Sequence, residues 1–305
     1  MRPEAGQRFA HFHVYSVLGR GGMGVVFSAY NVTSEQVVAL KLLSVDSAGD
    51  PETRERFRRE STLARTLSSA HAIPVLDAGE HQGELWLEMP LMAGEDLSAM
   101  LHREGTMGLA ATLAIIGCVA QALDDAHRIG LIHRDVKPGN IFLVPGTPGQ
   151  TPSAFLGDFG LTRSLAGTDP ELTRLDEVLG TAHYMSPEQA QRLPLGPPTD
   201  IYSLACVVFR CLAGEVPFPS PDARAAMFAH IHVESPSLLG RVPGVGPRLD
   251  EVLRRSLAKD PAVRPASATA LVQQLKRAAE ADAVSAEPGP ADGPPQRGRR
   301  WRRSR

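Results

Sequence analysis

The pattern of hydrophobic and polar positions changes character about one third of the way along the chain. Before residue 93, short runs rich in β-branched, aliphatic and aromatic residues alternate with turn residues, which is typical of β-strands. One segment, 51–67, begins with Pro51 and acidic residues and has helical spacing. The expected strands are 13–18, 25–30, 36–43, 73–78 and 85–89.

From residue 96 onward the apolar spacing is mostly helical. The predicted helices are 96–103, 109–128, 186–191, 200–212, 223–230, 249–258 and 267–283. A strand-rich first third followed by helices predicts a two-lobed α+β domain. We expect an N-terminal extension at 1–11, an N-lobe at 12–93, a C-lobe at 94–280 and a tail at 281–305.

Two apolar stretches, 109–120 and 201–212, are shorter than the roughly 18–20 residues that a membrane helix needs. We therefore interpret both as buried core helices. The first twelve residues lack the apolar segment of a secretory signal. The tail is rich in Pro and Gly and then basic, so it is predicted to be disordered.

The composition narrows the class of protein. Of 305 residues, 43% are hydrophobic and 22% are charged, as in ordinary globular proteins. Three cysteines are too few and too odd in number for a disulfide framework, which favours the cytoplasm. Six of the 32 basic residues lie in the last nine positions, so the rest of the chain has an excess of eight acidic residues. The domain is therefore not expected to bind nucleic acid.

A glycine-rich segment runs from Leu18 to Val26, and Gly19, Gly21 and Gly24 form the pattern G-x-G-x-x-G. Glycines let backbone N–H groups approach phosphates closely. A plain hairpin turn or a dinucleotide-binding loop would carry the same pattern. The dinucleotide loop requires a helix directly afterwards, whereas a strand-like run follows here. A hairpin over nucleotide phosphates is therefore favoured.

Two charged residues follow in the predicted N-lobe. Lys41 ends the strand-like sequence Val-Ala-Leu-Lys and is one of only four lysines in the chain. Glu60 lies on the predicted helix that follows, where it could form an ion pair with Lys41. Each residue alone would be interpreted as a solvated surface charge. The other motifs favour a functional role for both.

The strongest signal is the segment 133–140, His-Arg-Asp-Val-Lys-Pro-Gly-Asn. Asp135 can accept a hydroxyl proton, and Lys137 can neutralise a phosphoryl group in transfer. Asn140 can bind Mg²⁺ through its amide oxygen, and Asp158, in Asp-Phe-Gly, can complete a hard-oxygen site for the same ion.

These motifs occur in the order of the protein-kinase signature set. Three later segments agree: Ser-Pro-Glu at 186–188, the sequence beginning at Asp200, and 259–264, whose Arg264 would pair with Glu188. Over about residues 8–280 the chain resembles the Hanks-type serine/threonine protein kinases of bacteria, in particular the actinobacterial PknB-like group. The resemblance implies a bilobal fold, with a small antiparallel sheet and one helix in the N-lobe and a larger, mostly helical C-lobe.

The resemblance also implies roles for individual residues. Asp135 would orient and deprotonate a Ser or Thr hydroxyl, and Lys137 would stabilise the γ-phosphoryl group. Lys41, held by Glu60, would bind the α- and β-phosphates of ATP, while Asn140 and Asp158 would hold Mg²⁺. The implied nucleotide contacts are Leu18, Gly19, Arg20, Gly21, Gly22, Met23, Gly24, Val25, Val26, Ala39, Lys41, Met89, Pro90, Met92 and Phe142.

One position departs from the family pattern. Pro90 follows the implied gatekeeper Met89 where Glu is frequent. Proline lacks an N–H but keeps its carbonyl. The family contacts adenine through that carbonyl and through the N–H two residues on, at Met92. We therefore expect ATP binding to survive.

Control by phosphorylation is a further implication. Arg134 precedes Asp135, which in this family marks kinases that activation-loop phosphorylation switches on. We expect Arg134 to be an unpaired buried cation until a phosphate arrives, with Thr173 the first choice of site and Thr168 the second. Thr181 is expected to contact the catalytic loop near Asp135 and Lys137.

Two other functions remain open at this point. A pseudokinase scaffold that senses ATP would have the same fold, and a small-molecule phosphotransferase of related fold is a third reading. Complete catalytic motifs and the long segment up to Glu188 argue against both. Protein substrates are the expected partners, and the resemblance adds a capacity for N-lobe homodimers. The Arg-rich tail suggests contact with an anionic membrane surface, so that a cytoplasmic protein would lie at the inner face.

The remaining Cys and His residues receive a structural interpretation. Cys118, Cys206 and Cys211 are expected in the core. His127 is expected to pack beside the catalytic loop. The neighbouring pairs His11/His13 and His230/His232 lack nearby sequence partners for a closed Zn²⁺ site, so metal binding is not expected there.

Overall fold

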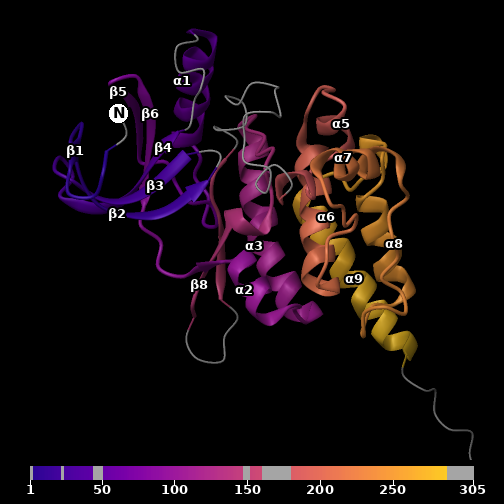
Figure 1. Cartoon of the computed structure of the whole chain (residues 1–305). Helices are drawn as coiled ribbons and strands as arrows, with labels where there is room; N and C mark the ends of the chain where they lie inside the picture. Colours follow the sequence, from indigo (N-terminus) through magenta and orange to yellow (C-terminus); the bar gives the residue numbers. More distant parts are fainter. Residues whose placement is uncertain (1–2, 22–23, 44–50, 147–151, 160–179, 287–305) are drawn as a thin grey trace, which may run out of the picture.

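The structure is a computed structural model that describes residues 3–21, 24–43, 51–146, 152–159 and 180–286. A β-sheet with one helix beside it forms the N-lobe, and a group of helices forms most of the larger C-lobe (Figure 1). This is the bilobal α+β arrangement that the sequence predicts.

The N-lobe sheet is antiparallel, with the spatial order β1-β2-β3-β4-β6-β5. Its strands are β1 (Arg8–Phe9), β2 (Phe12–Gly21), β3 (Gly24–Asn31), β4 (Gln36–Leu43), β5 (Asp77–His81) and β6 (Glu84–Pro90). The two-residue connection between β5 and β6 places Gln82 at φ 51° and Gly83 at φ 82°. Two successive positive φ values are those of a type I′ hairpin turn, whose twist matches that of the strands.

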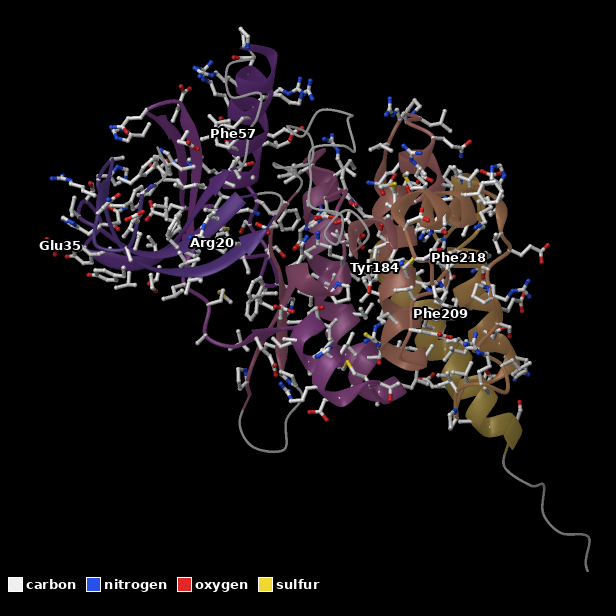
Figure 2. The ribbon with its side chains drawn as sticks, viewed as in Figure 1. Arg20, Glu35, Phe57, Tyr184, Phe209 and Phe218 are labelled. Atoms are coloured by element: carbon white, nitrogen blue, oxygen red, sulfur yellow. The ribbon has the colours of Figure 1, made fainter. Side chains whose placement is uncertain are left out.

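Helix α1 (Pro51–Arg65) stands beside this sheet (Figure 1). Ion pairs join it to β5: Arg54 lies 2.8 Å from Glu80, and Arg65 lies 3.0 Å from Asp77. Its apolar side is buried at Phe57, which is 2% exposed and is labelled in Figure 2.

A second sheet, made of short strands, lies between the N-lobe and the C-lobe helices. It consists of β7 (Glu95–Asp96), β8 (Ile141–Val144) and β9 (Ser153–Leu156). The sequence analysis missed these strands because two to four residues are too few to show a period. They matter for the site, since β8 directly follows Asn140 and β9 ends two residues before Asp158.

The C-lobe helices surround α6 (Pro197–Ala213), which is buried along nearly its whole length. The others are α2 (Leu97–Glu104), α3 (Leu109–Arg128), α5 (Pro187–Ala190), α7 (Ala223–His232), α8 (Pro247–Ser256) and α9 (Ala268–Ala286), with 3₁₀ turns at Pro138–Asn140 and Pro261–Val263. Phe209 of α6 belongs to the main core and lies among these helices (Figure 2).

Helix α3 meets the length and composition of a membrane-crossing helix. In the structure it packs against α9, β9 and α6, and its apolar residues, such as Ile116 and Leu123, belong to the core. The prediction of a core helix is therefore confirmed. Cys206 and Cys211 are also core residues, and burial raises the pKa of both thiols.

One predicted strand is misplaced at the N-terminal side, and the expected extension contains a strand. The strand expected at 73–78 is displaced, because Ile73 donates its N–H to Leu156 of β9 and only residues from Asp77 onward pair with β6. Part of the expected extension is a strand, since β1 pairs with β2 through Arg8 and Phe9.

The described chain stays helical beyond the predicted start of the tail. Helix α9 continues to Ala286, six residues past the boundary at 280. Asp282 gives the reason: its carboxylate accepts the N–H groups of Leu249 at 3.0 Å and Arg248 at 3.3 Å, in the first turn of α8. A Cβ on Gly246 would lie 2.4 Å from the Asp282 side chain, so this close approach requires glycine.

Replacing Asp282 with Ala should lower the free energy of unfolding by about 0.5–2 kcal/mol, the usual effect of losing a helix cap. Urea unfolding measures the change, and Glu280→Ala, an exposed position on the same helix, is the matched control. Equal stability of the two variants would show that the 281–286 segment does not contribute to the domain.

Candidate active site

A buried carboxylate on α6 anchors the segment 133–140. Asp200 is fully buried, and its oxygens accept the backbone N–H groups of His133 and Arg134, each at 2.8 Å. The imidazole of His127 donates to the same carboxylate at 2.7 Å. His127 therefore does more than pack, because it fixes the residue that holds the loop.

His133 connects this loop to the segment that carries Asp158. Its Nδ1 accepts the N–H of Asp135 at 3.2 Å, so the proton lies on Nε2, which donates to the carbonyl of Gly157 at 2.9 Å. The ring also lies 4.8 Å from the ring of Phe159. One neutral imidazole thus sets the spacing between Asp135 and Asp158.

Asp135, Lys137 and Asn140 form one connected group. Lys137 Nζ lies 2.8 Å from Asp135 Oδ2 and donates to Thr181 Oγ1 at 3.0 Å. Asn140 Nδ2 donates to the backbone carbonyl of Asp135 at 2.7 Å and to its carboxylate at 3.1 Å. The expected contact of Thr181 with the catalytic loop is confirmed. Because the amide nitrogen of Asn140 is used, its carbonyl oxygen stays available as a ligand.

Lys41 forms its ion pair with Asp158, at 2.8 Å, and not with Glu60. The Lys41 side chain is 4% exposed and the Asp158 side chain 27%. Burial alone would raise the pKa of Asp158, but the charge and hydrogen bond of Lys41, with the charge of Lys137 adding to them, hold that pKa below its usual value. Asp158 also has φ 59°, a sparsely populated conformation for a residue with a side chain.

Glu60 lies in an ion pair with Arg134 instead, at 3.1 Å. Two expectations are therefore corrected for this structure. Lys41 is not held by Glu60, and Arg134 is not an unpaired cation. The physical reason is the same for both: a partly buried Arg134 and a partly buried Glu60 compensate each other's charge.

An apolar cluster lies between the N-lobe sheet and the second sheet. It contains Ala39, Ile73 and Met89, with Val26, Met92, Phe142 and Phe155 packed against it. Five of these residues are predicted adenine contacts, and they come from β3, β4, β6, the segment after β6, and β8. The sequence missed Ile73 and Phe155. Leu18 stands apart from this cluster on β2, and it is 51% exposed.

The glycine-rich segment forms the ends of β2 and β3. Gly19, Arg20 and Gly21 lie on β2 and pair with Val26, Val25 and Gly24 of β3. Gly24 has φ 142°, and a Cβ there would lie 2.0 Å from the carbonyl oxygen of Leu42, so only glycine fits. A strand follows the glycines, as predicted. Gly22 and Met23 lie outside the described residues, as do Thr168 and Thr173.

Pro90 ends β6, where it lies opposite Val38 of β4. Proline is tolerated at this place because the last residue of a strand need not donate a ladder hydrogen bond. The chain then turns past Met92, which packs against the apolar cluster.

A short helix behind the catalytic loop supplies contacts that sequence reasoning missed. Ser186 and Gln189 form a capping box on α5. The side-chain Nε2 of Gln189 donates to the Arg134 carbonyl at 2.7 Å. The spacing Ser-x-x-Gln could have revealed this cap. Ser186 thus has its own part in holding the loop.

Glu188, on the same short helix, forms the most buried ion pair of the described chain. Arg264 donates to both oxygens of Glu188, at 2.7 and 2.9 Å, and Thr199 donates at 2.9 Å. Burial would raise the pKa of Glu188, but these hydrogen bonds and the charge of Arg264 hold it below 4.5. The predicted pairing is present.

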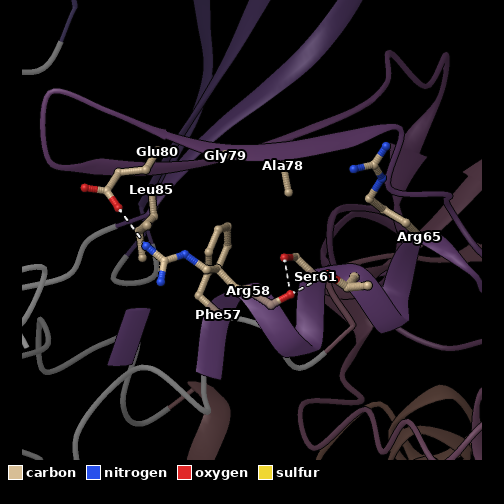
Figure 3. A pocket seen from close by; sticks show the side chains of 9 residues that line it. Phe57, Arg58, Ser61, Arg65, Ala78, Gly79, Glu80 and Leu85 are labelled. Atoms are coloured by element: carbon tan, nitrogen blue, oxygen red, sulfur yellow. Dashed lines mark hydrogen bonds and ion pairs between the residues drawn. The ribbon is translucent and has the colours of Figure 1, made fainter. Parts of the chain in front are cut away.

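A pocket of about 280 Å³ lies between α1 and the strands β5 and β6 (Figure 3). Phe57, Arg58 and Ser61 of α1 line it together with Gly79, Glu80 and Leu85 of the sheet. Residues of the catalytic group are absent from its lining. It therefore belongs to the packing of α1 on β5 and β6, where Arg58 approaches Glu80.

Comparisons with known proteins give a consistent picture. The family described as "Protein kinase domain" matches residues 12–275. Serine/threonine-protein kinase PknH of Mycobacterium tuberculosis is 39% identical over 86% of this chain and 41% of its own length. Serine/threonine-protein kinase PknE of the same species is 36% identical over 97% of this chain and 53% of its own length.

Solved structures agree with the sequence matches. The crystal structure of the Mycobacterium tuberculosis PknI kinase domain superposes with a TM-score of 0.73 and 31% identity, covering 91% of this chain and all of that one. The chain spans about half the length of the curated relatives that it matches.

Replacing Arg264 with Met should lower the free energy of unfolding at pH 7 by about 3–5 kcal/mol, because Glu188 would remain buried without its partner. The lowered pKa of Glu188 means that the pair stabilises the fold above the usual value of 4.5 and loses this effect as the pH falls below it. The difference between wild type and variant should therefore narrow in acid.

Urea unfolding at pH 7 and at successively lower pH measures both effects. Arg254→Met, an exposed arginine on α8, is the control and should change stability by no more than about 0.5 kcal/mol. A deficit of Arg264→Met that stays constant through acid pH would contradict the role of the Glu188 charge.

Proposed function

The chain belongs to the protein kinase family, in its bacterial Hanks-type serine/threonine group, and on this basis we propose that it transfers the γ-phosphoryl group of Mg·ATP to Ser or Thr hydroxyls of proteins. The observation that carries the proposal is the connected group of Asp135, Lys137 and Asn140, with Asp158 and Lys41 held to it through His133. These groups supply a base, cations and hard-oxygen ligands within one site.

The residues present fit Mg²⁺ and ATP. Asn140 keeps a carbonyl oxygen free, and Asp158 offers a partly exposed carboxylate. Both are hard ligands of the kind that Mg²⁺ prefers. When bound, the ion neutralises phosphate charge. The apolar cluster around Ala39 and Met89 supports adenine binding, and the ends of β2 and β3 would cover the phosphates.

Asp135 is the proposed base. Its carboxylate is held by Asn140 Nδ2, so it has a fixed direction in which to accept the substrate hydroxyl proton. Lys137 neutralises Asp135 in this structure, and it is close enough to stabilise the transferred phosphoryl group instead. Its bond to Thr181 links this chemistry to the end of the loop that protein substrates would contact.

Activation is proposed to exchange ion-pair partners. In this structure Glu60 holds Arg134 while Asp158 holds Lys41. A phosphate on Thr173, or on Thr168, carries about −1.5 to −2 charge and competes with Glu60 for Arg134. Glu60 then pairs with Lys41 and holds it against the nucleotide, and Asp158 binds the metal ion.

Protein substrates, a homodimer through the N-lobe and a cytoplasmic location are proposed from the resemblance to the family. The Arg-rich tail, with Trp301, lies outside the described residues. We propose that it contacts an anionic membrane surface, with about 1 kcal/mol for each basic residue at low salt.

Asp135→Asn should reduce ³²P transfer to a generic basic protein by at least about 100-fold, because a base is lost while size and the bond to Asn140 are kept. Asp125→Asn, which changes a carboxylate of α3 that pairs with Arg128 and not with the catalytic group, is the control and should retain wild-type activity. Transfer by Asp135→Asn at the wild-type rate, with an unchanged melting temperature, would argue for a contaminating kinase and revive the pseudokinase alternative.

Phosphatase treatment should lower the rate of the wild-type protein toward a peptide substrate, and Thr173→Ala combined with Thr168→Ala should reproduce the loss. If the phosphate acts through Arg134, the rate of Arg134→Gln should not respond to phosphatase. An equal response of wild type and Arg134→Gln would refute the proposed exchange, and full activity of the double Thr variant would exclude these sites.

A further inference from the structure

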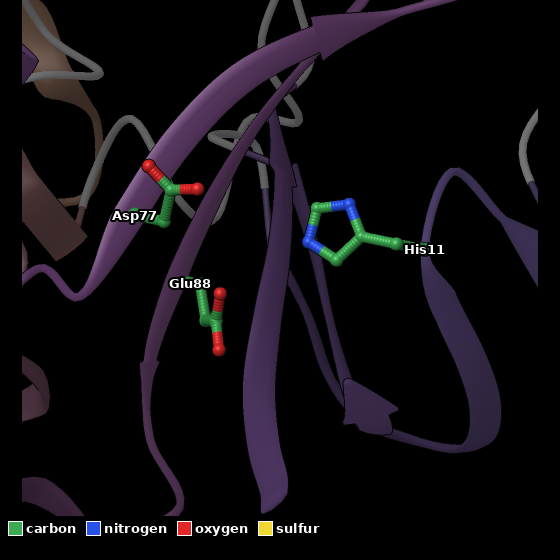
Figure 4. Close-up of side chains that lie close together, drawn as sticks. All are labelled: His11, Asp77 and Glu88. Atoms are coloured by element: carbon green, nitrogen blue, oxygen red, sulfur yellow. The ribbon is translucent and has the colours of Figure 1, made fainter. Parts of the chain in front are cut away.

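Three side chains from opposite ends of the strand order come together beside the N-lobe sheet (Figure 4). His11 lies in the turn between β1 and β2, Asp77 begins β5, and Glu88 lies on β6. One ligand atom from each, a ring nitrogen and two carboxylate oxygens, lies within 4.8 Å of the others. The residues near His11 in the sequence include no further metal ligands for a closed site, but the fold brings Asp77 and Glu88 close to it.

The sheet register makes the meeting of the two acids unavoidable. Asp77 and Glu88 are directly opposite each other in the β5–β6 ladder. Directly opposed residues project from the same face of a sheet, and like charges in that relation are destabilising. The β1–β2 turn is fixed beside them, because the His11 carbonyl accepts the N–H of Val32 at 3.0 Å and its ring packs on Phe12 and Trp86.

Glu88 is the residue that most needs a cation. It is 4% exposed, and in the part of the chain that the structure describes no Lys or Arg forms an ion pair with it. Its described side-chain partner is the neutral amide of Asn31, which donates to both carboxylate oxygens at 2.9 and 3.0 Å. A buried carboxylate facing a second carboxylate is costly without a positive charge between them. Arg65 reaches Asp77 only, at 3.0 Å.

We propose that His11, Asp77 and Glu88 bind one divalent first-row transition-metal ion of the Zn²⁺ class. One imidazole and two carboxylates suit such ions, whereas Mg²⁺ and Ca²⁺ prefer oxygen ligands alone. Ligand atoms of a tetrahedral zinc site lie about 3.3–3.6 Å apart, so a contraction of about 1 Å would close the site. Asn31 would orient Glu88 from behind, as outer partners of metal ligands do.

This site is separate from the proposed Mg²⁺ site. Glu88 lies opposite Leu40 of β4, and Lys41, the next residue on that strand, lies opposite Leu87. Successive strand residues point to opposite faces, so Glu88 and Lys41 lie on different faces of the sheet. The proposal therefore does not depend on the proposed kinase activity.

Calorimetric titration of the full chain with Zn²⁺, in a large excess of Mg²⁺ to occupy oxygen-only sites, should show one bound ion. His11→Ala and Asp77→Asn should each weaken this binding at least about tenfold. Both positions are partly exposed, and unchanged melting temperatures of the free variants show that they fold. His13→Ala, an exposed histidine two residues along, is the matched control and should bind as the wild type does.

Arg65 provides a test of opposite sign. It competes with the metal ion for Asp77, so Arg65→Ala should tighten Zn²⁺ binding by about two- to fivefold, the range expected for losing an exposed ion pair. A site elsewhere in the chain would not respond to this change.

Quenching of tryptophan fluorescence can show whether the ion binds beside His11. The His11 ring lies 5.4 Å from the Trp86 ring, and in Trp301→Phe, Trp86 is the sole tryptophan. Co²⁺ should quench Trp86 in this background and should fail to do so when His11→Ala is added. Absence of stoichiometric Zn²⁺ binding, or binding and quenching that survive His11→Ala, would overturn the proposal.

Discussion

The arrangement of the active site depends on one buried carboxylate. Asp200 sits on α6, the most enclosed helix of the C-lobe, and accepts N–H groups from His133, Arg134 and His127. Arg134 has φ 63°, a conformation that costs of order 1–3 kcal/mol in a residue with a side chain. The hydrogen bonds of Asp200 offset that strain. Catalytic geometry is therefore set by a helix that takes no part in the chemistry.

Four charges around this loop can pair in two ways. Lys41 and Arg134 are cations, Asp158 and Glu60 are anions, and in this structure they pair as Lys41–Asp158 and Arg134–Glu60. In the proposed second arrangement Glu60 pairs with Lys41, and a loop phosphate and a metal ion compensate Arg134 and Asp158, so both arrangements avoid a buried charge without a partner. We propose that a bound nucleotide with its metal ion and a loop phosphate select between the two arrangements, since a ligand shifts such an equilibrium by its difference in affinity for the two states.

The sequence predicted the parts of the site that are local. The spacing within 133–140 and the Asp-Phe-Gly segment fix which residues lie together, because short segments leave the backbone little choice. Pairings between distant segments were harder. Glu60 was assigned to Lys41, but its partner depends on how α1 packs, and that position is set by bonds such as Arg65–Asp77 that no local pattern reveals.

The same distinction explains the errors in the fold. β6 lies close to its predicted place because its apolar run is long, while β5 was misplaced because hydrogen bonds of Ile73 to β9 compete with the sheet. The end of α9 depends on Asp282 capping a helix that begins 35 residues earlier. The composition of the α9 sequence, rich in Ala and acidic residues, does not predict the contact between Asp282 and α8.

Strand register is what keeps the two proposed sites apart. On β4 and β6, Ala39, Lys41 and Met89 face the nucleotide side, and Leu40 and Glu88 face the other. A shift of one residue in the pairing would reverse every one of these side chains. The apolar residues Phe27, Leu40 and Trp86, packed on the far face, therefore do more than stabilise the sheet. By fixing the register they direct Lys41 toward the catalytic loop and leave Glu88 beside His11 and Asp77.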